Sequence, residues 1–132
     1  MNKALLLSTL LVSFGVVAQD DHPIDTELNE CLNNTSTTAG MGNCGSKAHE
    51  QWDAELNYYY KSLRNELSDD SKMVLIDSQR AWIKYRDLEI KNIRSMYGSK
   101  LGSMWGLIAL SDISKITKTR ALTLKDYYEK MK

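Results

Sequence analysis

The sequence predicts an all-α protein in which a disulfide attaches a short N-terminal helix to three long antiparallel helices. Apolar residues recur every three or four positions over long segments, and polar or glycine-containing turns separate these segments. No segment alternates with the period of two that is typical of a half-buried strand. Short turns between long helices favour antiparallel neighbours, so a small helical bundle is expected.

The first 18 residues have the features of a secretory signal peptide. Lys3 precedes an uncharged apolar run from Ala4 to Val17, and the small residue Ala18 gives the expected cleavage site. The run is shorter than the roughly 20 residues that cross a bilayer. No cysteine stands directly after Ala18 to carry a lipid anchor. We therefore expect residues 19–132 to form one periplasmic or secreted domain without a membrane span.

The charge balance excludes one class of partner. The sequence has 17 basic and 17 acidic residues. Removal of the signal peptide takes away Lys3, which leaves 16 basic residues and a net charge of −1. A nucleic-acid-binding protein normally has an excess of basic residues. Together with the expected export, this balance excludes nucleic acid as a partner.

Cys31 and Cys44 are the two cysteines of the sequence, and both follow the expected signal peptide. An oxidising compartment favours their pairing. A bridge that closes a loop of this length stabilises a protein by roughly 3 kcal/mol, which is large beside the net stability of a small domain. We therefore expect a disulfide between Cys31 and Cys44.

Residues 24–34 are expected to form the short helix, which begins near Pro23 with Asp25 or Thr26 as its N-cap. Its apolar side consists of Ile24, Leu28 and Leu32. The polar, glycine-containing segment 34–45 is expected to be a loop.

The three long helices are predicted over residues 46–67, from the capping segment 68–72 to Gly98, and over residues 103–130. Gly98 is the expected C-terminal cap of the second of them. The apolar stripe of the first is Ala48, Trp52, Leu56, Tyr59, Leu63 and Leu67. The row of the second is Ile76, Gln79, Ile83, Arg86, Ile90, Ile93 and Tyr97. The row of the third is Trp105, Ala109, Ile113, Ile116, Arg120, Leu124 and Tyr127.

The arginine in the second row, Arg86, is expected to be buried between helices. A buried guanidinium needs a carboxylate and further acceptors. The expected structural clasp consists of Asp53, Asn57, Gln79 and Arg86, with Asp53 as the ionic partner. Asp112 and Glu89 are the alternative partners. Arg80 lies off the row and is expected to be exposed, so Arg86→Ala would cost about 3–5 kcal/mol and Arg80→Ala less than about 1 kcal/mol.

No catalytic or metal-binding motif is present in the sequence. It lacks a nucleophile elbow, a phosphate-binding glycine loop and a haem-attachment motif. His22 and His49 have no second ligand at a metal-binding spacing. The candidates for paired acid–base carboxylates are Asp53, Glu55, Asp87 and Glu89. They are better explained as surface charges. We therefore expect no metal, no cofactor and no enzymatic activity.

Five segments together resemble the LprI-like lysozyme-inhibitor family of exported bacterial proteins. They are HPIDTELNECL, GMGNC, WDAELNYYYKSL, QRAWIKYRD and ITKTRALTLKDY. The resemblance extends over nearly all of residues 19–132. It implies a small helical periplasmic or cell-surface domain and, for at least some members, inhibition of host lysozyme. Members often carry a second cysteine pair, where this chain has Ile90 and Asp112, so packing alone is expected to join its last two helices.

An inhibitor of this kind needs a preorganised surface with aromatic anchors. Residues 94–106 offer such a surface around three glycines. The candidate partner-binding residues are Met96, Tyr97, Lys100, Met104 and Trp105. Alternatively, Tyr97 and Trp105 only complete two core stripes. A lysozyme inhibitor is therefore the expected function, and a periplasmic interaction or immunity protein with a different protein partner is the alternative.

Overall fold

The computed structural model describes residues 22–132, which form four helices. These helices are α1 (Pro23–Asn33), α2 (Thr38–Glu66), α3 (Asp69–Gly98) and α4 (Met104–Met131). No residue in the described range is in a strand, which confirms the predicted all-α class. In this range, none of the helices has the length and apolar character of a membrane span. The expected signal peptide, residues 1–18, lies outside the described residues.

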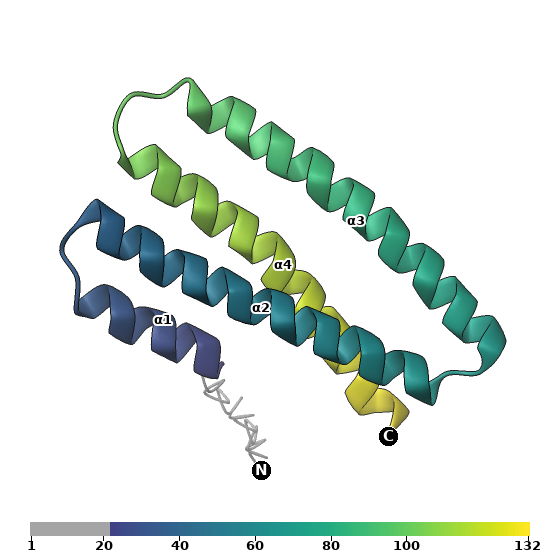
Figure 1. The fold of residues 1–132 in the computed structure, drawn as a ribbon. Helices are drawn as coiled ribbons and strands as arrows, with labels where there is room; N and C mark the ends of the chain where they lie inside the picture. Colours follow the sequence, from purple (N-terminus) through teal and green to yellow (C-terminus); the bar gives the residue numbers. More distant parts are fainter. Residues whose placement is uncertain (1–21) are drawn as a thin grey trace, which may run out of the picture.

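Helix α4 lies between α2 and α3, and α1 lies on the other side of α2 (Figure 1). Each long helix is antiparallel to the next one in the chain, so α2 and α4 run in the same direction. The contact between α2 and α4 is the most extensive in the bundle. Helix α1 packs on α2, and α3 packs on α4. The spatial order of the helices therefore differs from their order in the chain.

The core is centred on the contact between α2 and α4. Trp52 and Leu56 of α2 are 2% and 3% exposed, and Ala121 and Leu124 of α4 are 1% and 0% exposed. Ile24 of α1 and Leu75 of α3 complete the same buried cluster, so all four helices contribute to it. Burying one leucine-sized side chain stabilises a fold by about 1.5–3 kcal/mol. Most of the predicted stripe of α2 is thus buried as expected.

The segment 34–45 was expected to be a loop, and this prediction is wrong from Thr38 onward. Helix α2 begins there, and the side chain of Thr37 caps it by accepting a hydrogen bond from the amide of Gly40 at 3.0 Å. A Cβ atom on Gly45 would lie 2.9 Å from Cδ2 of Leu110, so the Leu110 side chain of α4 packs closely on this end of α2. Glycine disfavours a helix by about 1 kcal/mol, but tertiary packing overrides that preference here.

Helix α1 is bonded to α2 through the disulfide between Cys31 and Cys44, as predicted. The N-cap of α1 is neither Asp25 nor Thr26 but His22, whose Nδ1 accepts from the amide of Ile24 at 3.3 Å. The N-cap lies before the predicted residues because the helix already begins at Pro23, and proline is suited to the first helical position.

The contact of α3 with α4 includes polar side chains as well as apolar ones. Gln79 is 6% exposed, and its Oε1 accepts a hydrogen bond from Nε of Arg120 at 2.9 Å. Trp82 lies between two guanidinium groups, with the carbon of Arg86 at 5.4 Å from its ring centroid and that of Arg120 at 5.9 Å. Ile83 was expected in the buried row but is 38% exposed. The other six residues of the predicted row are buried or half-buried, and Trp82, which lies outside the row, is half-buried as well.

Removing the disulfide should lower stability without removing the helices. We expect replacement of both Cys31 and Cys44 by serine to lower the free energy of unfolding by about 2–4 kcal/mol, because the unfolded chain gains freedom. Urea unfolding followed by circular dichroism measures this loss, and the folded spectrum should change little. An unchanged unfolding midpoint would show that α1 needs no covalent attachment.

Replacing Arg120 should cost more stability than replacing Arg80 or Arg86 of α3. Arg120→Ala leaves the buried Gln79 without its hydrogen-bond partner, so the free energy of unfolding should fall by about 1–3 kcal/mol. Arg80→Ala should cost less than about 1 kcal/mol, because the Arg80 side chain is 74% exposed. Urea unfolding of the three variants ranks them, and a larger loss for Arg86→Ala than for Arg120→Ala would contradict this account.

Candidate functional site

The turn between α3 and α4 exposes three large apolar side chains. Leu101 is 96% exposed, Met104 is 57% exposed and Met96 is 46% exposed. We call these three residues the apolar tip. Exposed apolar side chains at a turn are available for contact with a partner. Met96 and Met104 were predicted for this surface, whereas Leu101, the most exposed of the three, was not.

The residues beneath the apolar tip are held by contacts between α3 and α4. The hydroxyl of Tyr97 donates a hydrogen bond to Oδ2 of Asp112 at 2.9 Å. The rings of Tyr97 and Trp105 are stacked, with centroids 5.6 Å apart. The ammonium group of Lys100 lies 5.7 Å from the centroid of the Trp105 ring. The structure thus brings together the predicted residues Tyr97, Lys100 and Trp105.

Electrostatics and backbone geometry both help to fix this turn. The hydrogen bond to Asp112 raises the pKa of Tyr97, which keeps the hydroxyl protonated and able to donate. Gly102 has a φ of 103°, a conformation that glycine adopts without strain. Gly98, the expected C-terminal cap, is instead the last residue of α3, and Ser99 follows as the cap. The cap lies one residue later than predicted, because α3 runs through Gly98 before the chain turns.

The predicted clasp between Arg86 and Asp53 is wrong. Arg86 donates to Oδ1 of its neighbour Asp87, at 2.9 Å from Nε and 2.7 Å from a terminal nitrogen. Asp53 accepts from Nδ2 of Asn57 at 3.0 Å, one turn along α2. Gln79 binds Arg120 of α4 instead. Only Asp53 and Asn57 of the four expected residues are hydrogen-bonded to each other, because α4 lies between α2 and α3 along much of their length.

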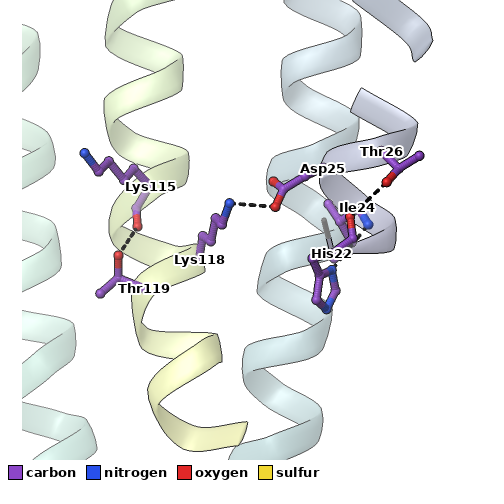
Figure 2. Close-up of polar contacts among 7 residues, drawn as sticks. All are labelled: His22, Ile24, Asp25, Thr26, Lys115, Lys118 and Thr119. Atoms are coloured by element: carbon purple, nitrogen blue, oxygen red, sulfur yellow. Dashed lines mark hydrogen bonds and ion pairs between the residues drawn. The ribbon is translucent and has the colours of Figure 1, made fainter. Parts of the chain in front are cut away.

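An apolar groove of about 540 Å³ separates α1 from α4. Its apolar lining comes from three helices and consists of Leu28, Leu32, Met41, Trp52, Leu107, Leu110 and Leu122. Nζ of Lys118 on α4 bonds to Oδ2 of Asp25 on α1 at 2.6 Å, and both residues also line the groove (Figure 2). The same ammonium lies 5.2 Å from the centroid of Trp52. This ion pair therefore joins α1 to α4 across the buried tryptophan.

Within residues 22–132, no group of three or more histidine, cysteine, aspartate or glutamate side chains could hold a metal ion. His22 packs on Trp52, with ring centroids 4.4 Å apart, and caps α1. The site offers apolar contact, aromatic rings and one cation at a turn, which is chemistry suited to binding.

Leu101 was not among the predicted binding residues, because apolar periodicity identifies the faces of helices and not single residues in turns. A single leucine between the glycine and serine residues of GSKLGS has no neighbours with which to form a stripe. An apolar residue in an otherwise polar turn between two long helices is the signal that could have found it. Arg120 lies inside the apolar row predicted for residues 103–130, and this position was the sequence signal for its inward contact with Gln79.

Known proteins similar to this chain agree with the fold. A crystal structure of an uncharacterized protein from Burkholderia thailandensis superposes with a TM-score of 0.78 and 27% sequence identity. The match covers 84% of this chain and 55% of the other, so this chain spans about half the length of that protein. A comparison with curated proteins finds no match.

A protein-family model described as "Lysozyme inhibitor LprI" matches residues 28–124. The matched residues include α4 through Leu124 and all of α2 and α3. They also include both cysteines of the disulfide and the turn that carries the apolar tip. The chain therefore belongs to the LprI lysozyme-inhibitor family.

Proposed function

We propose that residues 19–132 form an exported protein, periplasmic or secreted, that inhibits a lysozyme by binding it. Family membership supports the class of function, and the 96% exposure of Leu101 at the apolar tip is the observation that carries the choice of surface. In this proposal residues 1–18 are the signal peptide. The protein acts through contact and not through catalysis.

The shape and chemistry of the turn suit the substrate cleft of a glycosidase. Lysozymes bind sugar in a concave cleft in which two carboxyl groups flank the scissile bond. A turn at the end of two helices is convex, and its apolar side chains can enter such a cleft. Lys100, next to Leu101, supplies a cation for the carboxylates. Tyr97 and Trp105 hold the turn in place before binding, which lowers the entropy lost on association.

A lysis assay with purified lysozyme tests this proposal directly. Residues 19–132 should inhibit lysis of a cell-wall suspension in a dose-dependent manner. Leu101→Asp should raise the inhibition constant at least about tenfold, because it places a charge where an apolar side chain would be buried. Leu101 is almost fully exposed in the free protein, so the variant should fold normally.

Leu88→Asp is the matched control, because Leu88 is 68% exposed on α3 but lies outside the turn. This control should inhibit as well as the unmodified protein. Absence of inhibition by residues 19–132 would contradict the proposed function. Equal weakening by the two leucine variants would instead contradict the proposed surface.

A further inference from the structure

A second hollow lies between α2 and α3, near the turn that joins them. It has a volume of about 360 Å³, which is within the range of ligand-binding sites. Its lining consists of Asn57, Tyr60 and Arg64 from α2 and Ile76, Gln79, Arg80 and Ile83 from α3. We call it the α2–α3 cleft. It lies toward the opposite end of α3 from the apolar tip (Figure 1).

The polar side chains that line the α2–α3 cleft are rich in donors and include no carboxylate. Gln79 is 94% buried, since 6% of it is exposed, and its Oε1 already accepts from Arg120. Its amide nitrogen remains as a donor with no partner among residues 22–132. Arg80 is bonded only weakly, to Oδ1 of Asp77 at 3.4 Å. Such a lining is suited to an acceptor that carries negative charge.

Arg64 adds a second donor without a partner. Its Nε atom is buried and makes no hydrogen bond within the described part of the chain. The guanidinium carbon lies 5.5 Å from the centroid of the Tyr60 ring, which holds the group at the edge of the cleft. Since protein atoms enclose Nε, the part of Arg64 that can bind an acceptor in the cleft is the terminal end of its guanidinium group.

Positive charge continues beyond the cleft. Arg64 also lines an adjoining hollow of about 210 Å³ together with Lys61, Asn65 and Lys72. Two of these cations are paired with nearby carboxylates: Lys72 with Asp69 at 3.4 Å, and Arg80 with Asp77 at 3.4 Å. The four cations of the two linings share their hollows with no carboxylate, because the exposed carboxylates at this end, Glu66, Asp69, Asp70 and Asp77, line neither hollow.

We propose that the α2–α3 cleft binds an acidic segment of a partner protein. Carboxylates of the segment would contact Arg64, Arg80 and the amide of Gln79, while its apolar side chains would contact Ile76 and Ile83. The two hollows extend along α2 from Asn57 to Asn65, about 12 Å of helix, which matches roughly four residues of extended chain. This length favours a peptide with several carboxylates over a small acid with one.

A synthetic hexapeptide of alternating glutamate and leucine, with both ends capped, is the probe for this site. Titration calorimetry on residues 19–132 at low salt should detect binding of this peptide. The otherwise identical peptide with glutamine in place of glutamate should bind at least about tenfold more weakly, because charge-assisted hydrogen bonds are lost. Higher salt should weaken binding of the glutamate peptide, because ions screen exposed charges.

Variants locate the site on the protein. Arg64→Gln and Arg80→Gln should each raise the dissociation constant of the glutamate peptide by about tenfold. Arg80 is exposed, so its variant remains informative even if Arg64→Gln unfolds the protein. Arg94→Gln is the matched control on an exposed position of the same helix, and it should change the constant by less than about twofold.

Three outcomes would overturn the proposal: no binding of the glutamate peptide, equal binding of the glutamine peptide, or equal weakening by Arg94→Gln and Arg80→Gln. The site is independent of the apolar tip. Arg80→Gln should therefore leave lysozyme inhibition unchanged, and Leu101→Asp should leave peptide binding unchanged. Failure of one proposal can thus be distinguished from failure of the other.

Discussion

The contact between α2 and α4 is the interaction on which the rest of the structure depends. Trp52, Leu56 and Leu124 are almost fully buried in it, and the other two helices attach to this pair. Helix α1 is attached covalently through Cys31 and Cys44 and electrostatically through Lys118. Helix α3 has no covalent attachment within the described residues other than the chain itself. Its position is set by packing on α4 and by polar contacts.

This asymmetry explains why both candidate surfaces lie at the ends of α3. Hydrogen bonds from Arg120 to Gln79 and from Tyr97 to Asp112 fix the helix on one side, along α4. One end of α3 then presents the apolar tip, and the other presents the donors of the α2–α3 cleft.

Apolar periodicity, cap residues and the two cysteines were sufficient to predict the class of fold, the four helices and the disulfide. The first turns of α2 could not be predicted, because the helix there is stabilised by the close approach of Leu110 to Gly45. The prediction that Asp53 is the ionic partner of Arg86 was wrong for a related reason. Periodicity shows which face of a helix turns inward, but it does not show which helix that face will meet. In the fold, α4 has one face toward α2 and another toward α3, and Arg120 takes the place that was expected for Arg86.

The central claim is that the turn between α3 and α4 is the surface that contacts a lysozyme. Hydrogen–deuterium exchange of residues 19–132, measured free and with saturating lysozyme, tests it most directly, because amides of an exposed turn exchange quickly unless they are covered. The account predicts slower exchange on binding in residues 96–105 and no change in α1. Protection confined to α1, or to residues 57–64 and 76–83 of the α2–α3 cleft, would contradict it.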